Sequence, residues 1–244
     1  LGDVNGDGIL DIITANRSAN SVSVLLGNGD STFSTATNFS TGKYPQSVVL
    51  GDVNGDGRLD IITANYSGNS TSVLLGNGDG TFAATTTFST GMATNPRSVA
   101  LGDVNGDGRL DIITANRNSS TASVLLGTGG SAITATFTPQ QTFATGNAPK
   151  SVALADVNGD GRLDMITANI YANSTSVLLG NGNGNGTFGP NTDFSTGSLS
   201  NPASVTLGDV NGDGNLDIIT ANFTFPGKVS VLLGNGNGTF QGQQ

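Results

Sequence analysis

A nine-residue motif that occurs five times constrains this chain of 244 residues more than any other feature of its sequence. Each copy reads D-V-N-G-D-G-x-L-D. Successive copies begin about 50 residues apart, a period typical of repeat architectures in which each repeat is one supersecondary unit. The copies occupy residues 3–11, 52–60, 103–111, 156–164 and 209–217. The fold must therefore place five equivalent loops in five equivalent units.

The motif has the composition of a loop that binds a hard cation. Oxygen-bearing side chains stand at positions 1, 3, 5 and 9, and calcium takes about six to eight oxygen ligands. Gly at positions 4 and 6 allows the backbone angles that a tight curl needs. Position 7 would contribute only its backbone carbonyl, which agrees with its variation. The residues at position 7 are Ile9, Arg58, Arg109, Arg162 and Asn215.

The alternative is that these residues only form turns, for which Asp, Asn and Gly are well suited. A turn, however, gains nothing from three carboxylates held close together, which repel one another when no cation is present. Five copies with the same three aspartates favour the metal interpretation. The sequence therefore predicts about five Ca²⁺ ions, one for each loop.

The charge of the chain supports this interpretation. The net charge is −9, and the 18 acidic residues are all Asp. All but Asp30, Asp79 and Asp193 lie in the five motifs. Five divalent cations would therefore leave the loaded protein nearly neutral.

Composition also excludes several classes of function. The chain has no Cys and no His, so it can form neither disulfides nor thiolate or imidazole metal sites. The nine basic residues are scattered without a run or stripe, which argues against nucleic-acid binding. No apolar run is long enough for membrane insertion, and no signal peptide is visible at Leu1. A mature secreted chain would look like this, and so would an excised fragment.

The sequence of each repeat predicts four short β-strands, as the second repeat illustrates. Residues 46–50 form an apolar run that leads into the motif, and residues 59–65 are apolar on both sides of the strand alternation. Residues 71–75 read as a third strand, which ends in the turn Gly76–Gly80. Residues 81–88 form a fourth, more polar strand.

Inner strands that are apolar on both faces need cover on both sides, and a blade between two other blades provides it. We therefore predict an all-β fold, a β-propeller of about five four-stranded blades with one calcium loop between the first and second strands of each blade. A β-helix would need shorter repeats, and a string of sandwiches would need longer ones. The expected single domain is 1–244, with repeats at approximately 1–44, 45–95, 96–148, 149–201 and 202–244.

These segments resemble a known family. The D-V-N-G-D-G-x-L-D loop, the I-I-T-A-N strand and the L-L-G-N-G-x-G-T-F turn are similar to the FG-GAP/VCBS repeat, which builds the integrin α-subunit propeller and many bacterial surface proteins. The third repeat departs from this pattern, because Gly127–Ser131 replaces the usual turn and the Phe comes later, at Phe137. Integrin propellers have seven blades, whereas this chain shows five repeats, so the number of blades stays open.

The resemblance implies a calcium ligand set for every loop, formed by the side chains at positions 1, 3, 5 and 9 and the carbonyl at position 7. The implied ligands are Asp3, Asn5, Asp7, Ile9 and Asp11; Asp52, Asn54, Asp56, Arg58 and Asp60; Asp103, Asn105, Asp107, Arg109 and Asp111; Asp156, Asn158, Asp160, Arg162 and Asp164; Asp209, Asn211, Asp213, Asn215 and Asp217.

Two further patterns repeat with the motif. An Asn ends each second strand, and we expect it to cap a turn rather than to contact a ligand. These residues are Asn16, Asn65, Asn116, Asn169 and Asn222. A Phe follows the Gly-rich turn in four repeats, and we expect it to pack between blades. These residues are Phe33, Phe82, Phe188 and Phe240.

Three functions remain for such a chain. The first is a non-enzymatic adhesion, recognition or structural module, secreted or on the cell surface, whose protein or glycan ligand meets the variable connections at 42–44, 91–95, 146–148 and 197–201. The second is a lectin, against which the lack of Trp counts. The third is an enzyme, which we expect it not to be, because His and Glu are absent and few Asp lie outside the loops. The chain would then be at most the non-catalytic part of a secreted enzyme.

The ring is not expected to close within these residues. Repeats two to five each have a strand before the motif, at 47–50, 98–101, 151–154 and 204–207, but only Leu1 and Gly2 precede the first motif. The first blade should therefore lack its inner strand, and the last should have a shortened outer strand. Because unpaired edges invite pairing, we expect either a longer polypeptide or self-association into an oligomer or filament. A monomer that tolerates the gap is the alternative.

Overall fold

The structure is a computed structural model that describes residues 1–131 and 134–244, and its regular elements are almost entirely β-strands. The first sheet contains β1 (Ile12–Asn16), β2 (Ser21–Leu25) and β3 (Thr37–Ser40). The second sheet contains β4 (Pro45–Gly51), β5 (Asp60–Asn65), β6 (Ser70–Leu74) and β7 (Thr86–Ser89). The third contains β8 (Pro96–Gly102), β9 (Asp111–Asn116), β10 (Thr121–Leu125) and β13 (Gln141–Ala144). The sheet of the fourth repeat contains β14 (Pro149–Ala155), β15 (Asp164–Asn169), β16 (Ser174–Leu178) and β17 (Thr192–Ser195). That of the fifth repeat contains β18 (Pro202–Gly208), β19 (Asp217–Asn222) and β20 (Lys228–Leu232).

Only one short helix is present in the described residues, the 3-10 turn η1 (Arg17–Ala19). It is far too short to cross a membrane, and no other helix among the described residues is long and apolar enough to do so. The predicted all-β class is confirmed.

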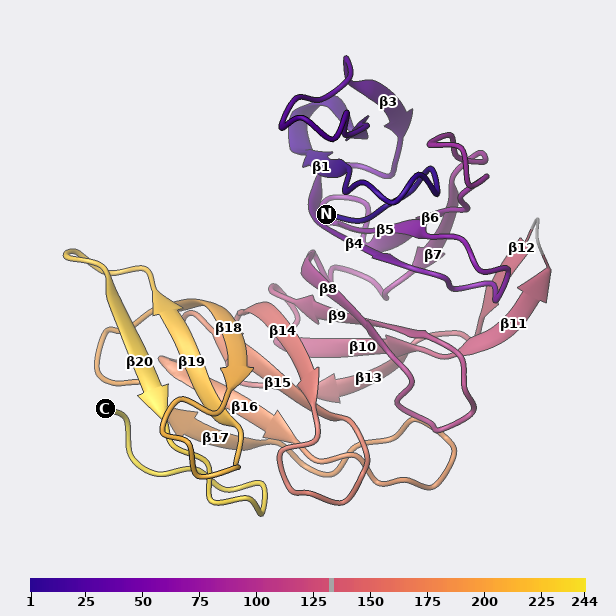
Figure 1. Ribbon diagram of the computed structural model, residues 1–244. Coiled ribbons are helices and arrows are strands. Elements are labelled where there is room, and N and C mark those ends of the chain that lie inside the picture. The colour runs from indigo at the N-terminus through magenta and orange to yellow at the C-terminus, as the bar shows by residue number, and fades with distance from the viewer. Residues whose placement is uncertain (132–133) are drawn as a thin grey trace.

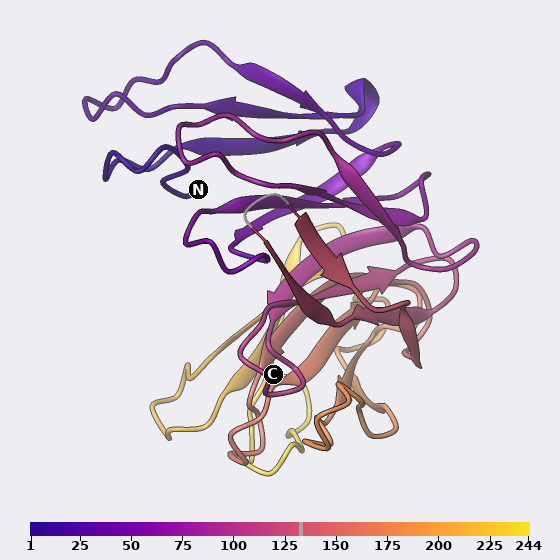
Figure 2. The same ribbon diagram turned by 90° about the vertical axis from the view of Figure 1, so that its right-hand side faces the viewer.

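The five sheets that contain these strands, one for each repeat, follow one another along an open arc (Figure 1). The first strands β4, β8, β14 and β18 contact one another in sequence order on the inner side of the arc. Figure 2 shows the first and last sheets well apart, at opposite ends of this arc. The arrangement is propeller-like but not closed.

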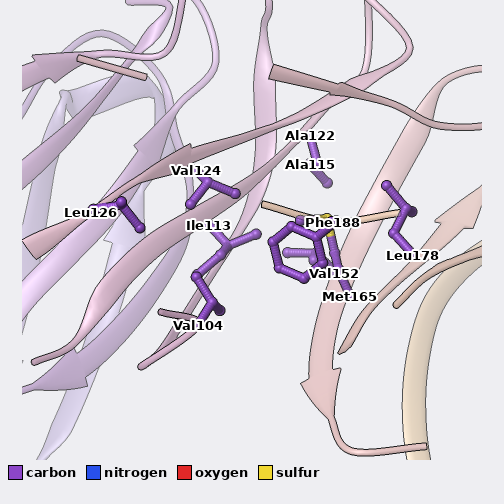
Figure 3. Close-up of a cluster of buried hydrophobic side chains, with 10 residues drawn as sticks. All are labelled: Val104, Ile113, Ala115, Ala122, Val124, Leu126, Val152, Met165, Leu178 and Phe188. Atoms are coloured by element: carbon purple, nitrogen blue, oxygen red, sulfur yellow. The ribbon is translucent and has the colours of Figure 1, made fainter. Parts of the chain in front are cut away.

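The second strands of the three middle sheets are sandwiched between two neighbouring sheets, which explains their apolar residues on both faces, whereas β1 and β19 of the terminal sheets are only partly buried. All six residues of β5, β9 and β15 are buried. Between the third and fourth sheets, Val104, Ile113 and Val124 pack against Met165 and Phe188 (Figure 3). An equivalent apolar cluster joins every pair of consecutive sheets. The blade prediction therefore identified the packing of the second strands correctly.

The repeated Phe residues pack across these junctions edge to face. Phe82 meets Phe39 of the first sheet with ring centroids 5.2 Å apart, and Phe188 meets Phe143 of the third sheet at 5.3 Å. The expected packing of Phe between blades is confirmed for these residues. Phe33 is the exception, because it lies on the free face of the first sheet and is 40% exposed.

The predicted count of five sheets is wrong, because the described residues form six. The additional sheet is the hairpin of β11 (Gly127–Ser131) and β12 (Thr134–Phe137) in the third repeat. This is the repeat whose turn departs from the common sequence, and the longer insertion allows two more strands to pair. Its Phe137 still reaches the junction with the second sheet, where its ring lies 5.0 Å from that of Phe88.

In the part of the chain that the structure describes, the two terminal sheets have three strands instead of four. The first sheet has no inner strand, and before its metal loop only a bridge between Gly2 and Asp11 forms. The last sheet ends at β20, and in place of a fourth strand only the backbone N–H of Gln244 donates to the carbonyl of Val231, at 2.9 Å. Both expected strand losses are confirmed.

Candidate calcium loops

The five motifs all form the same curled loop, at one end of the sheets, and in the second to fifth repeats this loop lies between the first and second strands. In the third loop, Gly106 and Gly108 have φ angles of 79° and 83°, in the left-handed region that favours glycine. The glycines at the same positions of the other loops also have positive φ. The predicted reason for Gly at positions 4 and 6 is therefore confirmed.

The Asp at position 1 organises the curl by accepting backbone N–H groups. Asp103 Oδ1 accepts from Gly106 at 2.7 Å and from Asp107 at 3.1 Å, and its Oδ2 accepts from Gly108 at 2.7 Å. The same three bonds form in the other four loops. This carboxylate therefore holds the loop in shape before any ligand is considered.

Positions 3 and 5 are also brought together with position 1. Asn105 Oδ1 accepts the N–H of Asp107 at 3.0 Å, and Asp107 Oδ1 accepts the N–H of Arg109 at 3.0 Å. The Asn105 amide donates to Asp107 Oδ2 at 3.2 Å. Local bonds of this kind orient the side-chain oxygens of an Asx turn. The structure thus gathers the predicted ligands at positions 1, 3 and 5 within one turn of chain.

Position 9 has a structural role that the sequence did not reveal. The side chain of Asp111 is fully buried, its Oδ2 accepts the N–H of Val104 at 2.9 Å, and its Oδ1 accepts the N–H of Gly127 at 2.8 Å. The carboxylate therefore ties the loop to the turn after the third strand. The equivalent residues Asp11, Asp60, Asp164 and Asp217 are also buried and make the same two bonds.

The turn partner of position 9 is a Gly that our reading of the sequence treated only as a turn former. A side chain at Gly76 would place Cβ 2.2 Å from the carbonyl oxygen of Leu59, and at Gly127 it would lie 2.5 Å from that of Leu110. Only Gly leaves room for this contact between the two segments. The sequence contained a sign of this constraint, because the Gly persists in the third repeat although the rest of that turn changes.

The buried carboxylates lie in an unfavourable electrostatic environment. The pKa of Asp111 is raised to about 6, chiefly by burial and also by the charges of Asp103 and Asp107, against the effect of its two backbone hydrogen bonds. Asp60 has the same causes and a pKa of about 6. In contrast, the backbone N–H of Gly8 and its neighbours lower the pKa of the exposed Asp3. A cation in the loop would relieve the repulsion that raises the position-9 values.

The side chain at position 7 interacts with the rest of the loop more than its sequence variation suggested. In three loops its Arg side chain folds back toward the carboxylate at position 5, in an exposed ion pair. The pairs are Arg58 with Asp56 at 3.8 Å, Arg109 with Asp107 at 3.2 Å, and Arg162 with Asp160 at 3.6 Å. The first and fifth loops have Ile9 and Asn215 there and so carry no such positive charge. The five loops are therefore chemically alike but not equal.

The donor set of each loop suits Ca²⁺, since it consists of three carboxylates, one amide and a backbone carbonyl. Within residues 1–131 and 134–244, no three acidic side chains are gathered into a metal cluster as the loops stand. The buried Asp explains this in part, because both of its oxygens are drawn to backbone donors. A carboxylate has about four lone-pair sites, so it retains capacity for a cation. The ligand assignment stays a prediction.

The repeated Asn at the end of each second strand belongs to the scaffold. Asn65 is fully buried, accepts from Thr63 at 2.9 Å, and donates to Ser70 at 3.2 Å and to Ser72 at 2.9 Å. Its partners are side chains of its own and the neighbouring strand, not the backbone of a turn. The expected structural role is correct, but the mechanism is a cross-strand polar network.

Comparison with protein families finds one model that matches most of the chain. Four overlapping segments match the FG-GAP-like repeat, at residues 3–63, 52–114, 103–167 and 156–220. The resemblance inferred from the loop, strand and turn segments is confirmed. No curated protein matches the chain by sequence.

Solved structures of similar fold cover nearly the whole chain at low identity. A lectin from Agrocybe aegerita that recognises non-reducing terminal N-acetylglucosamine is 24% identical, with a TM-score of 0.62 over 99% of this chain and 64% of that chain. A periplasmic gluconolactonase from Pseudomonas aeruginosa is 18% identical, with a TM-score of 0.67 over 99% and 68%. The V. cholerae biofilm matrix protein Bap1 is 17% identical, with a TM-score of 0.57 over 98% and 37%.

These likenesses show the fold alone, and the chain spans less than two thirds of the length of the lectin. They nevertheless overturn one prediction. We excluded an enzyme because the chain lacks His and Glu, yet the gluconolactonase is an enzyme of the same fold. The exclusion is therefore wrong as a deduction from composition, since Asp, Ser, Lys and Tyr remain available to supply chemistry on such a scaffold.

Proposed function

Because the chain belongs to the FG-GAP-like repeat family, we propose that it is a calcium-stabilised, propeller-like recognition module. The observation that carries the proposal is the repetition of one loop in all five sheets. Each loop leads into the strand that is sandwiched in the middle blades, and each contains three carboxylates. Binding of a cation to the folded loop would stabilise that connection, and with it the blade.

The opposite end of the sheets supports the recognition role. Because successive strands run antiparallel, the connections before each first strand and after each second strand all lie away from the calcium loops. Their sequences differ from repeat to repeat, whereas the loops do not. Varied loops on a rigid scaffold are where binding sites usually lie.

We also propose that the protein works outside the cell or on its surface. Loops of this type in extracellular modules bind calcium with Kd on the order of 10⁻⁴–10⁻³ M, which suits extracellular calcium and not that of the cytosol. Because the chain has no Cys, its folding does not depend on the redox environment. Bap1, a biofilm matrix protein of similar fold, is consistent with such a location but does not establish it.

The exposed faces of the first and last sheets favour a second copy of the chain as a partner. Val210 of the last sheet is 56% exposed, whereas the equivalent Val53 and Val104 are 5% and 8% exposed beneath the next sheet. At the other end of the arc, Leu10 and Phe33 are exposed on a face whose equivalents are covered. The two free faces are the two halves of an inter-sheet junction, so a second copy could dock head to tail.

Light scattering over a range of protein concentrations, with calcium present, tests this association. A mass that rises with concentration in the parent protein, and stays at one chain in the Val210→Asp variant, is expected. A constant monomer mass in the parent protein would exclude the head-to-tail contact.

The calcium proposal is tested by titration calorimetry and by thermal melting. We expect about five ions per chain and a melting temperature that rises with calcium concentration. Magnesium serves as the control, since it demands a tighter octahedral site. A melting temperature that is the same in EDTA and in calcium would refute the proposal.

A further inference from the structure

The end of the sheets opposite the calcium loops carries no acidic residue but most of the free positive charge. Its connections lie at 17–20, 41–44, 66–69, 90–95, 117–120, 145–148, 170–173, 196–201 and 223–227, and none contains Asp. Six of the nine basic residues lie in or directly beside these connections, and the other three are the Arg residues of the loops. The six are Arg17, Lys43, Arg97, Arg117, Lys150 and Lys228. A protein with a net charge of −9 therefore has one positively charged end.

Three of these cations are brought together by the inner strands and the adjoining connections. The pairing of β8 with β9 shifts register between Pro96 and Ser98, and that of β14 with β15 shifts between Pro149 and Ser151. Arg97 and Lys150 therefore occupy the same irregular position on neighbouring strands. Irregularities of the β-bulge type re-aim side chains and are common beside binding sites.

The electrostatics agree with this placement. Burial lowers the pKa of Lys150, and the positive charges of Arg97 and Arg117 lower it further. The charges that act on Lys150 are thus of its own sign. Holding like charges together without a nearby carboxylate is costly, and an anionic ligand would remove the cost.

Hydrogen-bond donors at this position also lack acceptors. Arg97 donates to Gln46 Oε1 at 3.2 Å, which links the equivalent residues of two neighbouring inner strands. The Nε of Arg97 and the Nε2 of Gln46 are both buried and have no hydrogen-bond partner. A buried donor without an acceptor destabilises the folded protein. The cluster therefore offers both charge and donors to an acceptor that the protein itself does not provide.

Aromatic rings accompany each of the three cations. Arg97 lies over the ring of Tyr66 at 4.4 Å, and Lys150 lies over that of Phe223 at 5.5 Å. Arg117 lies over the ring of Tyr171 at 5.2 Å and also donates to its hydroxyl. Tyr171 and Phe223 remain 58% and 75% exposed. These contacts fix the cations and leave aromatic surface open beside them.

We propose that the cluster of Arg97, Arg117 and Lys150 binds a carboxylate-bearing glycan. The guanidinium fork matches a carboxylate in two parallel hydrogen bonds. The exposed rings of Tyr171 and Phe223 suit the apolar face of a sugar ring, and the nearby Asn147 and Ser120 can bond to hydroxyls. Three cations on an otherwise acidic protein are too few for the long phosphate backbone of a nucleic acid.

This inference rests on the proposed recognition role and specifies its ligand class. The test is titration calorimetry of the calcium-loaded protein with a hyaluronan tetrasaccharide, whose glucuronates carry carboxylates. The carboxyl-reduced tetrasaccharide is the matched ligand control, and inorganic phosphate tests for a site that takes any anion. We expect binding of the acidic glycan that weakens with added NaCl, and no comparable binding of the other two.

Arg97→Gln and Lys150→Gln should each weaken binding about tenfold or more, because a charge-assisted bond is lost. Lys43→Gln makes the same change of charge at the same end but outside the cluster, and should bind like the parent protein. Equal melting temperatures in calcium will show that the variants are folded. If Arg97→Gln fails this check, Lys150→Gln and Arg117→Gln provide the comparison.

Equal binding of the reduced glycan, tighter binding of phosphate, or equal losses in Lys43→Gln would overturn the inference, as would the absence of binding. A protein that is stabilised by calcium but binds no acidic glycan would refute this inference alone. A protein that calcium does not stabilise would refute the proposed function instead.

Discussion

The two ends of the sheets differ in sequence, in charge and in chemistry. At the loop end the same residues recur in all five repeats, and their carboxylates bind backbone donors of their own blade. At the opposite end the connections vary, and the contacts join different sheets, as Arg117 does with Tyr171. The repeated end thus stabilises each blade, whereas the varied end forms a surface that only the assembled arc possesses.

The contrast shows why a repeat protein can be uniform and specific at once. Each blade must solve the same local problem of closing a loop and covering two apolar faces, so the same residues serve every blade. A binding site needs a particular set of groups in one place, and it can arise only where the repeats are allowed to differ. Four experiments can break or sharpen this comparison, beginning with the one that has the largest expected effect.

Removal of calcium should have the largest effect and should act through the loop end. With calcium at about 10 to 100 times Kd, each site contributes about 1–3 kcal/mol to the free energy of unfolding. Five sites should therefore change the melting temperature by many degrees, as measured by circular dichroism with and without EDTA. Amide exchange can locate the effect. If removal of calcium lowered the protection of amides only in the connections at the other end, the assignment of stability to the loops would be contradicted.

Asp111→Ala and Asp107→Ala should separate the structural carboxylate from the ligand carboxylate. In EDTA, Asp111→Ala leaves two buried N–H groups without an acceptor and should cost about 2–5 kcal/mol. Asp107→Ala removes a repelling charge and should cost much less in EDTA, although it should lower the calcium stoichiometry by one ion. Urea denaturation and titration calorimetry give the two quantities. Equal losses in EDTA would show that position 9 has no special structural role.

The Arg at position 7 should weaken calcium binding in the three loops that have it. The Arg109 side chain lies 3.2 Å from the Asp107 carboxylate, and an exposed pair of this kind is worth up to about 1 kcal/mol. Arg109→Ile should therefore raise the affinity of the third loop by about two- to fivefold, toward that of the first loop with Ile9. Calorimetry at low salt is the appropriate measurement, and unchanged affinity would mean that the pair opens without cost.

The pH should also change the stability of the protein in the absence of calcium. The pKa of Asp60 and of Asp111 is raised from 3.8 to about 6 by burial and by the neighbouring loop carboxylates. A carboxyl with a higher pKa in the folded state contributes stability that is complete below about pH 4 and is lost as the pH rises through about 6. The protein in EDTA should thus become more stable as the pH falls from 7 to about 4.5.

With calcium bound, the direction should reverse over the same range, because protons compete with the cation for the carboxylates. Melting curves at several pH values, with EDTA and with saturating calcium, test both directions. Parallel curves under the two conditions would indicate that the buried carboxylates do not sense the bound cation.

Local features of the site could be predicted because they depend on neighbours in sequence. The curl of the loop needs Gly at positions 4 and 6 and oxygens at 1, 3 and 5, all within a few residues of one another. The two bonds of Asp111 could not be read in this way, because one donor, Gly127, lies 16 residues away. Its distance depends on how β9 and β10 pair, which is a property of the sheet.

The sequence by itself determined the strand class, the repeat period and the placement of one curled loop in each repeat. Alternation, β-branched residues and turn glycines act over short stretches and need no distant partner. The tertiary structure decided which sheet faces are covered and that Arg97, Arg117 and Lys150 meet beside the aromatic rings. These features depend on contacts between repeats, and the sequence of one repeat holds no information about the residues that its neighbours will place against it.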